Sequence, residues 1–201
     1  MFIHWALKEI HLKIVYYGPA LGGKTANLQY IYSRIDPALK GDLVSLKTRE
    51  DRTIFFDFLQ LEVGTLDGKI PKFNLYTVPG QIVFDKTRQI VLNGVDGIVF
   101  VADSRREMMD ANLETLLDLE KHLIAGGKTL ERFPWVLQYN KRDLPNVETL
   151  AEMEHKLNFF HVPSFEAVAT RGQGVFSALK QAIKMVVASA QTQLGEKRMT
   201  A

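Results

Sequence analysis

Eight residues near the amino terminus constrain the fold of this chain more than any other segment. They run from Gly18 to Thr25 as Gly-Pro-Ala-Leu-Gly-Gly-Lys-Thr and fit the pattern G-x-x-x-x-G-K-[S/T]. The apolar run 12–17 before them predicts a strand, and the run 26–34 after them predicts a helix. A strand, a glycine turn and a helix start form a cradle of backbone amides that holds the phosphates of a nucleotide. A glycine-rich turn before an ordinary helix is the alternative, and the two flanks disfavour it.

The phosphate-loop pattern predicts a role for each of several residues. Lys24 is expected to reach the terminal phosphates and to act in catalysis, and the hydroxyl of Thr25 is expected to hold Mg²⁺. Contacts with the nucleotide are expected from Gly18, Leu21, Gly22, Gly23, Lys24, Thr25 and Ala26.

Composition limits the class of protein. The chain has 201 residues, of which 46% are apolar and 24% charged, and this is typical of a globular protein. We expect a single domain over 1–201, with its core at about 9–191 and a frayed tail at 194–201. The net charge of +2 gives no strong field for nucleic acid or an anionic membrane.

The chain carries no signal for membrane attachment. It has no cysteine, which excludes disulfides, thiolate metal sites, prenylation and palmitoylation, and Phe2 excludes a myristoylation signal. No apolar run approaches a transmembrane segment, and no secretory signal is recognisable. We therefore expect a cytoplasmic protein without a lipid anchor.

Strand and helix signals alternate along the chain, which predicts an α/β fold with a mostly parallel sheet and helices on both faces. The turn signal Asp67-Gly68 lies between two strand signals, so one antiparallel strand is expected at the sheet edge. Helices are expected before the stop at Gly126-Gly127 and after Gly174. The strand signals after the loop are the segments 53–63, 70–77, 97–102 and 135–139.

A second motif identifies the base. Asn140-Lys-Arg-Asp143 follows a buried strand, at the edge of the sheet where open α/β folds bind ligands. The Asp143 carboxylate can accept hydrogen bonds from N1–H and the exocyclic amine of guanine. Adenine would leave this carboxylate unpaired, at a cost above ~1–3 kcal/mol. By resemblance to guanine-nucleotide sites, Asn140 braces the loop and the base, and the stem of Lys141 lies across the ring.

A third segment, 166–170, follows the next short strand. There we expect the backbone amide of Ala169 to bond guanine O6, with Thr170 beside it in the site. Together with the phosphate loop, these segments favour GTP over ATP.

The middle of the chain supplies residues for hydrolysis. Gly80 and Gln81 follow a strand, and a glycine there can donate its N–H to the γ-phosphate while the glutamine orients the attacking water. Thr53 is expected to close on Mg²⁺ only when the γ-phosphate is present. Arg52 is either a source of positive charge for the transition state or a solvated surface arginine.

These residues give the chain, from about Glu9 to Gln191, a resemblance to the MglA-type bacterial small GTPases, which are Ras-like switches of cell polarity and of gliding or twitching motility. The segments that carry the resemblance are 13–19, 23–25, 52–53, 55–58, 75–81, 94–104, 140–145 and 166–170.

The resemblance implies a P-loop NTPase of the small-GTPase (Ras-like) fold that binds GTP and GDP with Mg²⁺ and hydrolyses GTP slowly. It implies a roadblock-type GTPase-activating homodimer that rearranges the switches without inserting an arginine, and polarity or motility effectors at a cell pole. It also favours Arg52 as the internal arginine finger and Gln81 as the catalytic residue that orients water.

Two residues depart from common patterns. Thr77 stands where most small GTPases have the aspartate of D-x-x-G, a difference shared with the MglA-type family. Asp57 is expected either to replace its negative charge or to cap a solvent edge. Ala20 stands where the family has glycine, and its methyl group can crowd the γ-phosphate. Two hypotheses follow: a switch that cycles between GTP and GDP, and a nucleotide-loaded scaffold with little or no hydrolysis. An ATP-dependent kinase is a weaker third reading, because the guanine motif opposes it.

Overall fold

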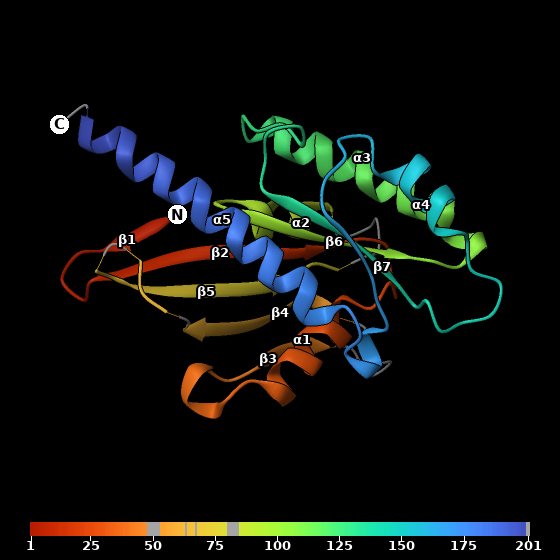
Figure 1. Cartoon of the computed structure of the whole chain (residues 1–201), viewed down its shortest axis with the longest axis horizontal. Helices are drawn as coiled ribbons and strands as arrows, with labels where there is room; N and C mark the ends of the chain where they lie inside the picture. The colour runs from red at the N-terminus through yellow and green to blue at the C-terminus, as the bar shows by residue number, and fades with distance from the viewer. Residues whose placement is uncertain (48–52, 63, 67, 80–84, 200–201) are drawn as a thin grey trace.

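An eight-stranded mixed sheet forms the centre of the molecule (Figure 1). The computed structural model describes residues 1–47, 53–62, 64–66, 68–79 and 85–199. The strands follow the order β3-β4-β5-β2-β6-β7-β8, and β1 pairs with β2. Their bounds are β1 Phe2–His4, β2 Glu9–Tyr17, β3 Val44–Lys47, β4 Thr53–Glu62, β5 Ile70–Thr77, β6 Gly97–Asp103, β7 Trp135–Asn140 and β8 Ser164–Glu166.

Helices cover both faces of the sheet (Figure 1). The helices α1 (Lys24–Arg34) and α5 (Val175–Met199) pack on one face, through residues such as Ile31 and Val186. The helices α2 (Asp85–Leu92), α3 (Met109–Ala125) and α4 (Leu150–Leu157) pack on the other. Short 3-10 turns lie at Pro37–Leu39, Arg106–Met108 and Ala169–Arg171. None of the described helices has both the length and the apolar character needed to cross a membrane.

Burial explains the strand sequences. Every residue of β6 and β7 is buried, since helices lie on both sides, and this accounts for their continuous apolar runs. In β5, nearer the sheet edge, buried and accessible residues alternate. In α3, Leu116 and Leu123 are buried, but Leu117 and Ile124 of the same apolar pattern are exposed.

The predicted α/β fold is confirmed, including the antiparallel pairing of β4 with β5 and the parallel pairing of β2 with β5 and β6. The sheet also has two antiparallel pairings that the sequence did not predict, β1 with β2 and β3 with β4. As a result β3, and not β4, is the edge strand. Strands of three and four residues are too short for a clear alternating pattern.

The carboxyl-terminal helix is longer than expected. A frayed tail was predicted from residue 194, but α5 continues to Met199 and Leu194 is buried. Val186, Ala190 and Leu194 are four residues apart and continue one buried stripe of the helix.

Candidate nucleotide-binding site

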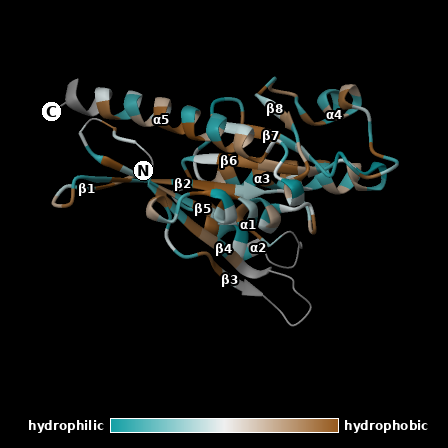
Figure 2. Ribbon diagram, turned by 60° about the horizontal axis from the view of Figure 1, so that its bottom comes forward, coloured by the Kyte–Doolittle hydropathy of each residue, from teal (hydrophilic) through white to brown (hydrophobic). Residues whose placement is uncertain are grey.

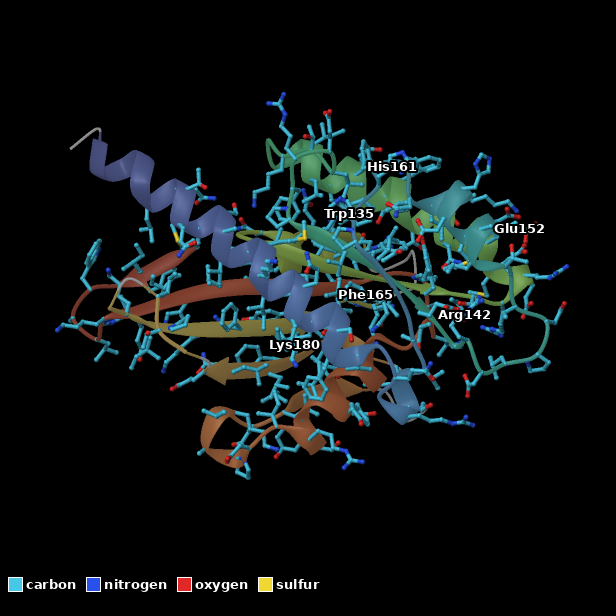
Figure 3. All side chains as sticks on the ribbon, in the orientation of Figure 1. Trp135, Arg142, Glu152, His161, Phe165 and Lys180 are labelled. Carbon is cyan, nitrogen blue, oxygen red and sulfur yellow. The ribbon has the colours of Figure 1, made fainter. Side chains whose placement is uncertain are left out.

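The predicted binding segments meet at the carboxyl ends of the parallel strands. The phosphate loop follows β2, Asn140 ends β7, and the segment at Ala169 follows β8. Figure 3 labels Arg142 in the loop after β7, at the end of the molecule far from β1. Strand ends at this edge form the crevice in which open α/β sheets bind ligands.

Two glycines give the phosphate loop its path. Gly18 has a φ of +137° and Gly23 a φ of +103°, a region that side chains disfavour. A Cβ on Gly18 would lie 2.2 Å from the carbonyl oxygen of Val101 in β6. Gly23 is also the residue before α1, so the first amides of the helix point toward the loop.

Lys24 is buried beneath this loop. Its Nζ donates to the carbonyl oxygens of Gly18 at 2.8 Å and Pro19 at 2.7 Å. Burial, followed by the charge of Arg88 in α2, lowers the pKa of Lys24 to about 7. Phosphate oxygens near this ammonium would oppose the shift, since negative charge favours the protonated form.

A hydroxyl and carboxylate cluster lies beside Lys24. The Thr25 hydroxyl donates to Asp57 Oδ2 at 2.6 Å, and the Thr77 hydroxyl donates to the same oxygen at 2.8 Å. The hydroxyl of Ser45 donates to Asp57 Oδ1. Only 1% of Asp57 is exposed, so it does not cap a solvent edge. The structure therefore brings a negative charge to Thr25, although residue 77 itself has none.

Asn140 joins the base segments to the phosphate loop. Its Nδ2 donates to the Gly22 carbonyl oxygen at 2.8 Å, and its Oδ1 accepts from the Ala169 amide at 2.9 Å. The amide that was expected to bond guanine O6 is thus bonded to Asn140 in this structure. Gly23 must be glycine for this contact, because a Cβ there would lie 2.1 Å from Asn140 Nδ2. One buried side chain thus fixes the relative positions of three segments that are far apart in sequence.

Lys141 is held by a residue that sequence reasoning missed. Its Nζ donates to Asp103 Oδ2 at 2.6 Å, and Arg105 Nη2 donates to the same carboxylate at 2.7 Å. Asp103 is fully buried; burial alone would raise its pKa, but the bonds from Arg105 and Lys141 lower it. The available signal was its place as the last residue of β6, at the ligand-binding edge of the sheet.

The remaining predicted contacts are more accessible. Leu21 and Thr170 are exposed, and Ala26 packs partly buried against the core. Asp143 is also accessible, and Arg171 Nη2 lies 3.6 Å from its carboxylate. Asp143 and Ala169 lie in adjacent loops, because the Arg142 amide donates to the Ala167 carbonyl oxygen at 3.1 Å.

Three predicted catalytic or switch residues, Arg52, Gly80 and Gln81, lie outside the described residues. Thr53 begins β4 and pairs with Lys47, but only its backbone is described. The roles assigned to these four residues stay predictions.

A mostly parallel sheet with the phosphate-loop motif after one strand and the predicted base motifs after two others is the arrangement of a small GTPase of the Ras-like class. The chain belongs to the ADP-ribosylation factor family, whose model matches residues 7–189. It is similar to "Mutual gliding-motility protein MglA" of Myxococcus xanthus (strain DK1622), with 52% identity over 186 residues, or 92% of this chain and 95% of the relative. The protein is therefore a GTPase that binds guanine nucleotides.

Proposed function

We propose that this protein is a switch that cycles between GTP and GDP and controls partners in cell polarity and motility. The observation that best supports a guanine-nucleotide switch is the pair of hydrogen bonds from the Asn140 side chain to Gly22 and Ala169. These bonds connect the base loops to the phosphate loop. The motility role is taken from the relative, which is named a mutual gliding-motility protein.

Nucleotide binding divides between two sets of residues. The phosphate loop, from Gly18 to Thr25, and the amide of Ala26 surround the phosphates, and Lys24 neutralises part of their charge. Asp143 reads the guanine edge, the Lys141 stem covers the ring, and Ala169 and Thr170 close the base pocket. The base specificity depends on Asp143, because adenine has neither an N1–H nor a 2-amino group to donate to the carboxylate.

Mg²⁺ fits the hydroxyl and carboxylate cluster, since hard oxygen ligands are the ones it prefers. Thr25 and Thr53 would hold the ion, and Asp57 would accept hydrogen bonds from its water shell in place of the aspartate missing at Thr77. Bound there, the ion would neutralise charge that develops on the phosphates.

Hydrolysis is the attack of water on the γ-phosphorus, with cleavage of the bond to the β–γ bridging oxygen and release of GDP and phosphate. Gln81 orients the water, Gly80 donates its amide to the γ-phosphate, and Lys24 and Arg52 stabilise the charge on the transferred group. We propose that this reaction is slow without an activating partner.

The proposed activator is a roadblock-type homodimer that rearranges the segments around Thr53 and Gly80 without supplying an arginine. The two nucleotide states would then select different polarity or motility effectors, and the GTP state would gather at a cell pole.

The decisive experiment is to denature the purified protein and identify the released nucleotide by mass spectrometry. We expect guanosine phosphates, and single-turnover hydrolysis that a roadblock-type protein accelerates. An adenine nucleotide, or a protein that cannot be loaded with guanine nucleotide and Mg²⁺, would contradict the proposal.

A second candidate function is a nucleotide-loaded scaffold with little turnover. Ala20 favours it, since this partly buried residue adds a methyl group to the phosphate loop. Hydrolysis by the Ala20→Gly variant separates the two functions.

A further inference from the structure

Two buried amide side chains, Asn27 of α1 and Gln138 of β7, form a hydrogen-bonded pair in the core next to the phosphate loop. Gln138 Nε2 donates to Asn27 Oδ1 at 3.0 Å, and neither residue is exposed to solvent. Figure 2 shows the hydrophobic colouring of the neighbouring strand β6, at the centre of the sheet. The pair therefore places polar groups in largely apolar surroundings.

Such a pair does not stabilise a core better than apolar side chains would. A buried amide loses its hydrogen bonds with water, and each polar atom left unpaired costs ~1–3 kcal/mol. Within the described part of the chain, Gln138 Oε1 has no hydrogen-bond partner, so the pair is only partly satisfied. Buried polar groups of this kind need an explanation other than packing.

The pair is connected to the phosphate loop through Gly23. Asn27 Nδ2 donates to the Gly23 carbonyl oxygen at 3.0 Å, and the backbone amide of Asn27 donates to the same oxygen at 3.1 Å. Gly23 is the residue before α1, and no side chain caps the helix there. Two hydrogen bonds from one residue thus fix the direction of this carbonyl group, and Gln138 holds the side chain that makes one of them.

Strand β7 holds two successive carbonyl groups of the loop. Gln138 and Asn140 are two residues apart in this strand, so their side chains lie on the same face of the sheet. Asn140 bonds the Gly22 carbonyl directly, whereas Gln138 reaches the Gly23 carbonyl through Asn27.

The direction of these carbonyls determines that of the next two amides. The peptide bonds of the described residues are trans, and in a trans peptide unit the C=O and N–H bonds point in opposite directions. The amides of Gly23 and Lys24 therefore point away from Asn140 and Asn27. Neither amide donates a hydrogen bond to another described residue. Unpaired amides at the start of a helix are suited to bind phosphate oxygens.

We propose that Asn27 and Gln138 are positioning residues for phosphate binding. Through the Gly23 carbonyl, they hold the Lys24 amide in the direction in which it binds a phosphate oxygen of the nucleotide. Asn140 also bonds the base loop, so the Asn27–Gln138 pair is the one that acts on the phosphates without the base. This inference rests on the proposed assignment of the loop to the phosphates and is independent of hydrolysis and motility.

Affinities for GDP and for guanosine test the proposal, because guanosine has the base but no phosphate. Both are measured on the full chain by competition with fluorescent GDP. Gln138→Leu and Asn27→Leu should each weaken GDP by about tenfold or more and leave guanosine within about twofold of wild type. Thr115→Val is the control, because it removes a hydrogen bond to the Ala111 carbonyl within α3. It should change neither affinity.

A double variant, Asn27→Leu with Gln138→Leu, separates positioning from stability. Each single variant leaves the partner amide unpaired, so each should lower the urea midpoint of the nucleotide-free protein. The double variant removes both amides and should recover that midpoint. Its GDP affinity should stay low, because the Gly23 carbonyl still lacks its second donor.

A double variant that regains wild-type GDP affinity together with its stability would overturn the proposal and leave the pair a structural role. Single variants with unchanged GDP affinity would overturn it too, as would equal losses for GDP and guanosine, which would mean that the pair acts on the base through Asn140. A wild type that binds guanosine as tightly as GDP would instead refute the proposed phosphate loop itself, and this inference with it.

Discussion

The hydroxyl of Thr25 donates a 2.6 Å hydrogen bond to the carboxylate of Asp57, a residue 32 positions later in the chain. Thr25 belongs to the phosphate loop, and Asp57 lies in the middle of β4. The bond places a buried carboxylate beside the hydroxyl that we propose holds Mg²⁺. It thereby offers a replacement for the carboxylate that Thr77 lacks.

Asp57→Asn should therefore weaken retention of nucleotide in the presence of Mg²⁺. We expect release of fluorescent GDP to accelerate by about 10–100-fold, as is usual when a group that orients metal ligands is lost. With EDTA, wild type and variant should release at similar rates. Ser45→Ala, which removes one donor but keeps the carboxylate, is the matched control. Equal release rates in Mg²⁺ would leave Asp57 with a purely structural role.

Asp143→Asn should change the base that the protein prefers. Loss of the carboxylate should weaken GDP by about 5- to 150-fold, the equivalent of ~1–3 kcal/mol, and should favour xanthosine diphosphate. Calorimetric titration with both nucleotides measures the switch. Glu166→Gln removes a neighbouring carboxylate that pairs with Arg142 at 2.8 Å and should leave the preference for guanine unchanged. An Asp143→Asn protein with wild-type GDP affinity would show that another group reads the base.

Asp103 and Lys141 should act as a coupled pair in base binding. Asp103→Asn and Lys141→Ala should each weaken GDP, and the double variant should lose less than the sum of the two. The physical reason is that Asp103 holds the Lys141 ammonium at 2.6 Å and so sets the position of its stem. Additive losses in GDP affinity would mean that Asp103 acts on stability alone.

The same carboxylate predicts a dependence of stability on pH. Because the pKa of Asp103 is lower in the folded protein than in the unfolded chain, its contribution is present above about pH 4 and is lost as the pH falls further. Urea unfolding should give wild type a free energy of unfolding ~1–3 kcal/mol above that of Asp103→Asn at pH 6, and a smaller difference at pH 3.5. A constant difference between the two proteins across this range would contradict the prediction.

Gly23→Ala should disrupt the hydrogen bond by which Asn140 joins the phosphate loop to the base loops. The added Cβ would lie 2.1 Å from Asn140 Nδ2, so either the loop or the asparagine must move. We expect GDP affinity to fall by at least about tenfold, since small displacements are costly at such sites. Gly127→Ala is the control, because Gly127 also has a positive φ, +71°, but has nothing within 4 Å of the new Cβ. It should cost about 1 kcal/mol of stability and leave GDP affinity intact.

Ala20→Gly should accelerate GTP hydrolysis if the extra methyl group crowds the catalytic groups. A displacement of about 1 Å can cost about 10²-fold in rate, which sets the upper size of the gain. Single-turnover hydrolysis with a roadblock-type activator measures it, and GDP affinity serves as the control. An unchanged rate would show that the loop accommodates alanine, and would remove the basis for the scaffold hypothesis.

Much of this protein follows from local sequence. The register of Gly18, Lys24 and Thr25 between a strand and a helix predicted the phosphate loop, and the position of Asn140 after a buried strand predicted where the base loops lie. These signals are local because a turn, a helix start and a strand end depend on residues close together in the chain. The long parallel strands were predicted for the same reason, since burial on both faces makes them apolar throughout.

Only the tertiary structure decided which distant residues meet. From the sequence, Asp57 could either replace the charge missing at Thr77 or cap a solvent edge. The pairing of β4 with β5, beside α1, brings its carboxylate to Thr25. No residue near Asp103 in the chain indicates that its carboxylate contacts Lys141. Likewise, no local pattern indicates that Trp5 and Lys69 lie in adjacent turns. Such contacts depend on strand order and on the packing of the sheet between helices. Both are set by the free energy of the whole chain, so they produce no periodic pattern of residues within any one segment.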